Sequence, residues 1–280
     1  MNGTESNALL GLFAALCLGK KRRFLMLVSY TDDTGHSKDP NRHHIGLGGL
    51  LADSEKWTAF DAMWRLVCKE EGVVLPFDMK SFAAKKKGTQ FADPKWADNS
   101  KRTRLMKRLV DVIDSTEALP IGAIVDVPDF RSLSAEQQSG LGGPRKEPYQ
   151  LAFQSCTNEL VRSAIFLSDV RDGVSMVYSI QAEHHGFAGS MWRIMQAVSP
   201  LGSFMIGSFT EGTPLQYTPL QAADLWAYEL GHHFNYIIPN DKPWRKSFTR
   251  LVAMATSRSP TARPFTYYHR ERMLGMEDGD

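Results

Sequence analysis

The sequence contains few cysteines, and their scarcity restricts the class of protein. Its 280 residues include only Cys17, Cys68 and Cys156, which are not spaced as zinc ligands are. An odd number of scattered cysteines favours reduced thiols in the cytoplasm over a disulfide framework. We therefore expect a cytoplasmic protein without structural zinc.

Long apolar runs are absent as well. No stretch reaches the roughly 18 apolar residues that a membrane-spanning helix needs, so no membrane partner is expected. The first apolar stretch, NALLGLFAALCLG, precedes the basic cluster KKRR, which is the reverse of the order in a signal peptide. We expect residues 1–25 to form an N-terminal extension, either a short docking helix or a non-native start.

Several familiar catalytic signatures are also missing. The chain has no Gly-x-Ser-x-Gly elbow, no Gly-Lys-Ser/Thr phosphate loop and no His-Glu-x-x-His motif. Its histidines include three adjacent pairs, which are His43 and His44, His184 and His185, and His232 and His233. Neighbours on a strand face opposite sides, so at most one of each pair could serve one site. His184 or His185 could move a proton beside Glu183, although a surface position is the favoured interpretation.

Positive charge is concentrated in one segment. The net charge is only +2, but residues 80–110 contain ten Lys or Arg and two Asp, a local balance of +8. Such a segment is either a solvated helix face or a track for the phosphates of DNA or RNA. The candidate nucleic-acid-binding residues are Lys85, Lys86, Lys87, Arg104 and Arg108.

Hydrophobic periodicity predicts alternating strands and helices. Strands are expected at residues 24–31, 43–52, 119–127, 174–183 and 203–210. Helices are expected at residues 54–72, 99–115, 149–168, 190–199 and 217–234, the last with Thr218 as its cap. This order predicts an α/β fold in which helices flank a mixed central sheet of about five strands. Residues 26–240 would form the domain, and residues 241–280 a C-terminal extension.

Two further segments are expected to lack regular helical structure. Residues 73–82, VVLPFDMKSF, look short and extended. Residues 132–148 are rich in Ser, Gly, Gln and Pro, which indicates a mobile loop.

Carboxylates occur at positions that a fold of this kind could bring together. Asp32 and Asp33, in YTDDTG, close the first predicted strand, where they could form a turn or hold a metal ion. Asp224 lies beside the apolar stripe of its helix, so it needs a partner, either a hydrogen-bond donor or a metal. Glu183 ends the fourth predicted strand, and Asp126, near the end of the third, is a weaker candidate.

Acids at two strand ends and on a later helix are the parts of a two-metal site. Such a site holds two Mg²⁺ or Mn²⁺ ions about 3.5–4 Å apart, which activate a water and stabilise the leaving oxygen of a phosphodiester. The sheet could gather Asp32, Glu183 and Asp224 despite their wide spacing in the sequence.

A family resemblance adds to this interpretation. YTDDTG resembles the Tyr-x-Asp-Glu-Ser-Gly opening of the family known as domain of unknown function 3800, and PLQAADLWAY is similar to that family's closing Gln-x-Ala-Asp helix. Between them, GLGGLLA matches the Gly-rich second strand and PFDMKSF a short polar stretch. The resemblance covers residues 26–235.

The resemblance implies a ribonuclease H-like fold with metal-binding acids. Asp32 would match the first-strand acid, Asp33 the Glu that follows it, Glu183 the fourth-strand acid and Asp224 the acid of the last helix. Position 33 is Asp where the family usually has Glu, and Glu183 stands where Asp is commoner. The resulting hypothesis is a metal-dependent nuclease in which Asp32, Glu183 and Asp224 bind Mg²⁺ or Mn²⁺ and Asp33 assists. The alternative is a catalytically inactive nucleic-acid-binding or protein-interaction module of a mobile element or defence system.

Overall fold

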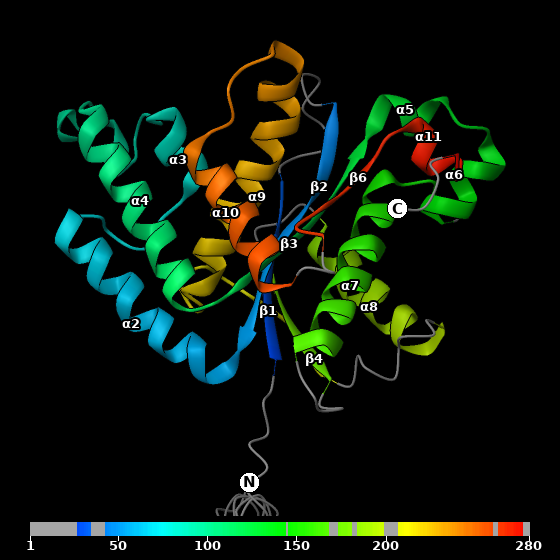
Figure 1. Cartoon of the computed structure of the whole chain (residues 1–280), viewed down its shortest axis with the longest axis horizontal. Coiled ribbons are helices and arrows are strands. Elements are labelled where there is room, and N and C mark those ends of the chain that lie inside the picture. Colours follow the sequence, from blue (N-terminus) through cyan, green and yellow to red (C-terminus); the bar gives the residue numbers. More distant parts are fainter. Residues whose placement is uncertain are drawn as a thin grey trace, which may run out of the picture.

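A six-stranded mixed sheet forms the centre of the computed structural model (Figure 1). The structure describes residues 27–34, 43–143, 145–167, 173–180, 184–198, 207–259 and 263–276. The strands are β1 (Leu27–Asp33), β2 (His44–Asp53), β3 (Leu119–Asp126), β4 (Val174–Ser179), β5 (Phe209–Gly212) and β6 (Thr266–Tyr268). The predicted class, α/β with a mixed sheet flanked by helices, is confirmed, with six strands instead of five.

The order of the strands is β5-β4-β1-β2-β3-β6. β1, β2 and β3 pair antiparallel in succession, whereas β4 lies parallel to β1 on its other side. β5 and β6 extend the two ends of the sheet by parallel pairing with β4 and β3. Because β1 and β4 are parallel, the chain leaves both strands at the same edge of the sheet.

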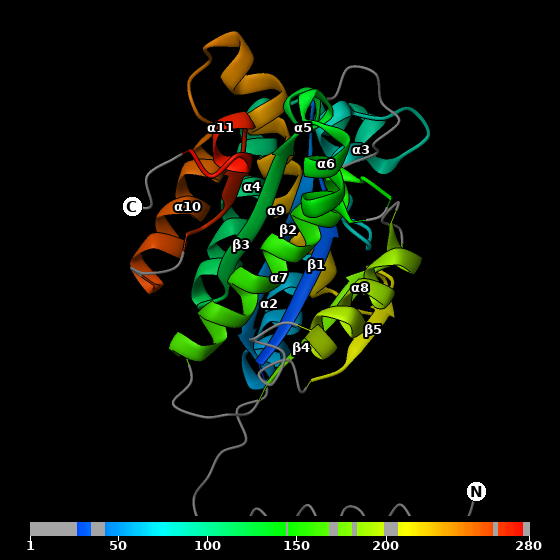
Figure 2. The ribbon, with the colours of Figure 1, turned by 90° about the vertical axis from the view of Figure 1, so that its right-hand side faces the viewer.

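Helices cover both faces of this sheet (Figures 1 and 2). One face packs against α2, α9 and α10, with α4 outside, in a core that includes Leu50, Trp64 and Trp226. The other face packs against α7 and α8 around Phe153 and Trp192. The longer helices are α2 (Ser54–Glu71), α4 (Asn99–Ser115), α7 (Pro148–Leu167), α8 (His185–Val198), α9 (Pro219–His232) and α10 (Lys246–Arg258). No helix among the described residues is long and apolar enough to cross a bilayer.

Two helices occur where the sequence predicted none. Residues 79–84 form α3 (Met79–Ala84), because Asp78 accepts a hydrogen bond from the Ser81 N–H and caps the first turn. The expected mobile loop contains α6 (Ala135–Gly142), whose start is fixed by a reciprocal capping box between Ser134 and Gln137. Each prediction of irregular structure was therefore wrong in part: residues 73–78 are non-helical as expected, but residues 79–82 belong to α3, and α6 occupies the middle of the expected loop.

Other boundaries differ in smaller ways. The fifth strand begins at Phe209, while residues 203–206 of the predicted strand lie outside the described residues. Thr218 does not cap α9, since its side chain makes no capping hydrogen bond and instead accepts one from Arg65. The other short helices are α5 (Val127–Ser132) and α11 (Arg270–Met273), with single turns at Gln90–Ala92, Pro94–Trp96, His233–Ile237 and Ile238–Asn240.

The chain beyond residue 240 contributes to the same sheet and core. In α10, Phe248 and Leu251 are almost fully buried in the core that α9 and α4 share. β6 pairs with β3, which adds a sixth strand to the five expected from residues 26–240. The predicted N-terminal extension, residues 1–25, lies outside the described residues.

Candidate functional site

Asp32 lies near the end of the central strand and faces α9. Side chains alternate between the faces of a strand, so Val28, Tyr30 and Asp32 share one face of β1 while Leu27 and Asp33 occupy the other. Val28 belongs to the core on the α2 and α9 side, and Leu27 to the core on the α7 side. The two adjacent acids of the YTDDTG motif therefore lie on opposite faces of the sheet.

Helix α9 approaches the sheet closely beside Asp32. Asp32 is paired in register with Gly48 of β2, and a Cβ at Gly48 would lie only 2.7 Å from the Ala227 Cα of α9. Only glycine at position 48 leaves room for the helix backbone there. Asp224 precedes Ala227 by almost one turn, which places its carboxylate near the end of β1.

Asp32 and Asp224 influence each other electrostatically. Each is only 8% exposed. Burial, followed by the nearby charges of Asp224 and Asp33, raises the pKa of Asp32 well above its ordinary value. Burial likewise raises the pKa of Asp224 to about 7, against the hydrogen bond from Met79 and the positive charge of Lys80. Two buried acids that resist losing both protons are the electrostatic signature of a site that a cation would stabilise.

Backbone groups hold one oxygen of each carboxylate. The Asp33 N–H donates to Asp32 Oδ1 at 2.8 Å, and the Met79 N–H donates to Asp224 Oδ2 at 2.7 Å. The backbone partner considered for Asp224 on sequence grounds is thus present. Among the described residues, Asp32 Oδ2 and Asp224 Oδ1 have no hydrogen-bond partner, so each acid retains one oxygen for a ligand.

Gln221, one turn before Asp224, attaches the same segment to α9. Its side-chain oxygen accepts hydrogen bonds from the Phe77 N–H at 2.9 Å and the Trp64 indole at 3.0 Å. Its amide donates to the Pro214 carbonyl at 2.8 Å. Gln221 and Asp224, one turn apart on α9, therefore accept hydrogen bonds from the Phe77 N–H and the Met79 N–H. These two bonds hold the start of α3 next to the acids.

Lys80 and Asp78 belong to this site, although sequence reasoning missed both roles. Asp78 raises the pKa of Asp224 through its charge, and Lys80 lowers the pKa of both Asp32 and Asp224. Both side chains are half-buried. The signal in the sequence was the alternation of Phe77 and Met79, which are buried, with charged residues in PFDMKSF.

Asp33 lies beside a group of aromatic rings on the α7 face. The hydroxyls of Tyr149 and Tyr178 are hydrogen-bonded to each other, and burial raises the pKa of both well above the ordinary value. The charge of Asp33 contributes to both shifts. The His184 ring stacks on Tyr149 with centroids 3.9 Å apart, so His184 is half-buried and not on the open surface that its sequence favoured.

Glu183, the predicted fourth-strand acid, lies outside the described residues, so the structure does not place it. Among the residues that are described, no three His, Cys, Asp or Glu side chains gather closely enough to form a metal site. The chemistry of the donors nonetheless fits a hard divalent cation, because Asp32 and Asp224 each offer an oxygen that no described residue hydrogen-bonds, in a buried, acidic setting.

Two other sequence candidates have structural roles. Asp126 accepts a hydrogen bond from the Asp129 N–H, which caps α5, and lies 3.3 Å from His44 Nε2. These two interactions are sufficient to explain the position of the Asp126 carboxylate, so no bound ligand is needed to explain it. His233 is buried and stacked on Phe248, and burial lowers its pKa to about 4.

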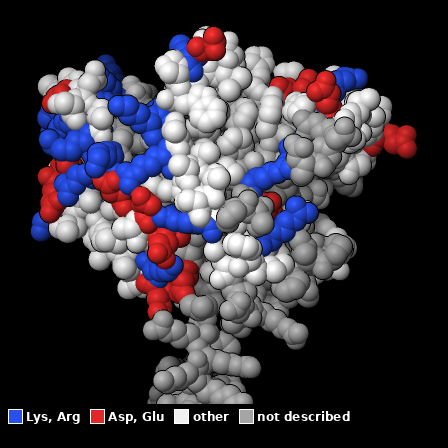
Figure 3. Space-filling model, in the orientation of Figure 1, with Lys and Arg blue, Asp and Glu red and all other residues white. Residues whose placement is uncertain are grey.

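The predicted basic residues divide into two groups. Arg104 and Arg108 both bind the buried carboxylate of Glu71, at 2.9 and 3.0 Å, so they connect α4 to α2. Lys85, Lys86 and Lys87 are exposed directly after α3, the helix that carries Lys80. Figure 3 shows Lys and Arg side chains gathered over the α3 and α4 region of this face.

No protein-family model matches the chain, and no curated protein matches it. The proposed function therefore rests on the residues of the site alone.

Proposed function

We propose that the chain is a metal-dependent phosphodiester hydrolase, a nuclease, with its metal site at Asp32 and Asp224. The observation that carries the proposal is the pair of buried carboxylates from β1 and α9. Each is fixed by one backbone N–H, and each has one oxygen without a hydrogen-bond partner in the part of the chain that the structure describes. A buried pair of this kind is costly unless a cation or proton compensates it.

The arrangement of the strands supports a ribonuclease H-like site. An acid ends the central strand β1, which pairs antiparallel with β2, and β2 pairs antiparallel with β3, although α2, α3 and α4 lie between β2 and β3 in the chain. β4 is parallel to β1, and the last acid comes from a helix against the sheet. Glu183 follows β4, which leaves the sheet at the same edge as Asp32. In this proposal Glu183 completes the metal ligands from that edge.

Bound Mg²⁺ or Mn²⁺ would supply activation of a water and stabilisation of the leaving oxygen. The chain's own residues then hold and orient the two carboxylates that bind the metal. The Asp33 N–H orients Asp32, and the Met79 N–H orients Asp224, so the ligands need little rearrangement on binding. Lys80, whose charge already acts on both acids, would bind a non-bridging oxygen of the scissile phosphate.

A substrate panel tests this function directly. Purified protein is incubated with single-stranded DNA, duplex DNA, RNA and an RNA–DNA hybrid in Mg²⁺ or Mn²⁺. We expect cleavage of at least one substrate, and its loss in both Asp32→Asn and Asp224→Asn. Neither variant should lower the thermal midpoint, because removing one of two negative charges removes the electrostatic repulsion between them in the folded state.

Asp53→Asn is the matched control. Asp53 also ends a strand, but at the opposite edge of the sheet, where it pairs with Leu27 and caps α2. Asn caps helices as well as Asp does, so this variant should keep full activity. Cleavage that persists in Asp32→Asn or Asp224→Asn would reject the assignment of the site.

A binding module without catalysis is the second candidate function. Its supporting observation is the exposed cluster of Lys85, Lys86 and Lys87, which does not depend on the carboxylates. Under this alternative the protein retains nucleic acid in a salt-dependent way and cleaves none of the substrates with either metal.

A further inference from the structure

The segment that joins α9 to α10 carries exposed aromatic side chains. Among the described residues, three large aromatic side chains are exposed, and two of them, Tyr236 and Trp244, belong to this segment. Tyr236 is 59% exposed. The chain has six tryptophans, of which five are buried, whereas Trp244 is 52% exposed. Large rings gathered on the surface in this way indicate a binding surface.

These rings lie at the edge of the sheet that carries the acid pair. Asn235, which precedes Tyr236, accepts hydrogen bonds from the His43 and His44 N–H groups at 2.9 and 3.0 Å. β2 begins at His44 and runs antiparallel to β1, so its start lies beside the end of β1 near Asp32. Figure 1 shows the connection from α9 to α10 at the top of the view.

A line of rings on α9 joins this segment to the acid pair. Tyr228, His232 and Tyr236 follow Asp224 at intervals of four residues, which places them on one stripe of α9 and of the turn that continues it. The centroids of neighbouring rings lie 5.7 and 5.3 Å apart. At a rise of 1.5 Å per residue, Tyr236 lies about 18 Å from Asp224 along the helix. A stacked strand advances about 3.4 Å per nucleotide, so about five nucleotides fit this distance.

Positive charge accompanies the rings. The Lys242 ammonium lies 5.3 Å from the centre of the Tyr236 ring, and the Arg245 guanidinium lies 5.7 Å from that of Tyr228. Arg245 is partly neutralised by the buried Glu229, which is 3.2 Å away. Lys242 and Lys246 are exposed, and neither forms an ion pair with a residue that the structure describes. These two ammonium groups are therefore available to phosphates.

The positive surface continues from Arg245 toward α3. Arg102 of α4 donates to the Phe82 carbonyl at 2.6 Å, and its guanidinium lies 4.1 Å from the centre of the Phe82 ring. Burial, followed by the positive charge of Arg245, lowers the pKa of Arg102, so the two guanidinium groups are near each other. The exposed lysines at positions 85–87 follow α3 directly. Cations thus connect the aromatic segment with the basic cluster described above.

We propose that the substrate is single-stranded nucleic acid, DNA or RNA, whose bases stack on Tyr236 and Trp244 while its backbone leads to the acid pair; this rests on the nuclease function proposed above. Aromatic side chains stack on unpaired bases of any sequence, and cations beside them hold the phosphates. A duplex keeps its bases stacked on one another and offers their faces to such rings only at its ends.

Fluorescence anisotropy of the full chain in EDTA measures binding separately from cleavage. The probes are labelled oligomers of about 20 nucleotides, longer than the distance from Asp224 to Tyr236 requires. They are oligo(dT), oligo(rU), a DNA duplex and an abasic deoxyribose phosphate strand. We expect at least one of the two single strands to bind at least about tenfold more tightly than the duplex and the abasic strand. The two single strands distinguish DNA from RNA. Duplex or abasic strand bound as tightly as both single strands would overturn the proposal.

Variants locate the stacking surface. Trp244→Ala and Tyr236→Ala each remove an exposed ring, so they should keep the thermal midpoint and weaken single-strand binding at least about fivefold. Trp244→Phe retains a ring and should retain most of the affinity. The matched control is Phe166→Ala, which removes a 53% exposed ring from α7 on the other face of the sheet and should leave binding unchanged.

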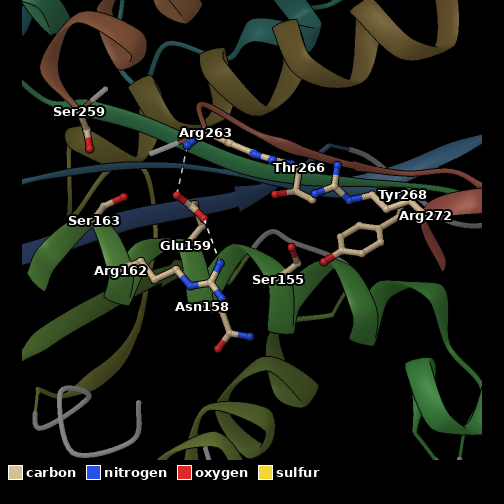
Figure 4. Close-up of a pocket in the computed structure, with 10 residues that line it drawn as sticks. All are labelled: Ser155, Asn158, Glu159, Arg162, Ser163, Ser259, Arg263, Thr266, Tyr268 and Arg272. Carbon is tan, nitrogen blue, oxygen red and sulfur yellow. Dashed lines mark hydrogen bonds and ion pairs between the residues drawn. The ribbon is translucent and has the colours of Figure 1, made fainter. Parts of the chain in front are cut away.

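A second pair of variants tests the phosphate contacts. Lys242→Ala should weaken binding and flatten its log–log dependence on salt by about 0.7. The control is Arg162→Ala, at a 70% exposed side chain of α7 beside a polar cavity of about 420 Å³ (Figure 4). Because this arginine lies on the other face of the sheet, the control should bind as the wild type does.

Tryptophan emission reports stacking independently of affinity. A base stacked on Trp244 should quench its emission, and Trp244→Phe should bind with less quenching. The proposal is overturned if neither single strand binds, if Trp244→Ala and Tyr236→Ala both bind as the wild type does, or if binding leaves the emission unchanged. Cleavage without a preference for single strands would overturn this inference and leave the nuclease function intact. Single-strand binding without any cleavage would support the stacking surface and reject the nuclease.

Discussion

Asp224 uses its two carboxylate oxygens for different purposes. One accepts the Met79 N–H and so holds the start of α3 against α9, and the other lies in the acidic space shared with Asp32. The same residue therefore has a structural and a proposed functional role. Substitution by Asn keeps an oxygen for the backbone hydrogen bond while it removes the charge, which makes it a cleaner test than Ala.

The raised pKa of Asp224 predicts how stability depends on pH. Its pKa is about 7 in the folded chain and near 3.8 when unfolded. Between these values the folded state binds the proton more tightly, so the stability of the metal-free protein falls as pH rises from about 4 to about 7. Above pH 7 this contribution is constant.

The difference between wild type and Asp224→Asn isolates this effect from other acids. Thermal midpoints measured across that pH range in EDTA should fall more steeply for the wild type than for the variant. Parallel curves would show that Asp224 titrates normally and is not part of a repelling pair.

At the scale of elements, the site depends on how closely α9 packs against the sheet. Gly48 permits the contact with Ala227, and Gly231 permits a second one, since a Cβ there would lie 2.9 Å from the Thr34 side chain. These contacts set the height of α9 above β1 and therefore the separation of Asp224 from Asp32.

Gly48→Ala is expected to disturb both stability and activity. The added methyl would overlap the α9 backbone, which cannot move as a flexible side chain can, so unfolding free energy should fall by about 1–3 kcal/mol. Metal-dependent cleavage should fall further, because Asp224 moves with the helix. Denaturant unfolding and the cleavage assay measure the two effects.

Gly140→Ala provides the contrast. Gly140 lies in α6, and an added Cβ meets no heavy atom within 4 Å. This variant should gain about 0.4–1 kcal/mol of stability at unchanged activity. A Gly48→Ala protein that is as stable and active as the wild type would refute the argued helix–sheet contact.

How much could be predicted from sequence differs between elements. Strong periodicity located the long helices and the first four strands, and the position of Asp224 beside an apolar stripe indicated its burial. The short helices α3 and α6 depend on local caps at Asp78 and Ser134, and the three-residue β6 depends on pairing with β3. The caps are local, but the pairing of β6 and the hydrogen bonds that hold the start of α3 against α9 join residues distant in sequence. The nearness of Lys80 to the acids depends on those distant contacts.

At the scale of the whole molecule, charge is unevenly distributed. Arg104 and Arg108 compensate the charge of the buried Glu71. Replacing either would leave this buried acid less well paired and destabilise the fold, so a loss of binding could not be separated from a loss of stability. The exposed Lys85, Lys86 and Lys87 are the cleaner probe of phosphate contacts.

Replacing these three lysines together by Ala should change the salt dependence of nucleic-acid binding. Each phosphate contact contributes a log–log slope of about −0.7 to −0.9, so the slope should flatten by roughly two to three units. All sequences should be affected alike, because phosphate contacts carry no base specificity. Fluorescence anisotropy at salt concentrations between about 50 and 200 mM measures the binding affinity and so gives this slope.

A triple substitution of the exposed Lys69, Arg131 and Lys146 by Ala is the control, since it removes the same charge elsewhere on the chain. If both triple variants flatten the slope equally, the attraction is general and the three lysines form no track.

A calorimetric titration of the metal-free protein with Mn²⁺ at pH 8, above the pKa of Asp224, tests the proposed metal site most directly. We expect wild type and Asp53→Asn to bind at least one ion per chain, and Asp32→Asn and Asp224→Asn each to bind at least about tenfold more weakly. Absence of Mn²⁺ binding in the wild type, or equal binding in all four proteins, would contradict the proposed metal site.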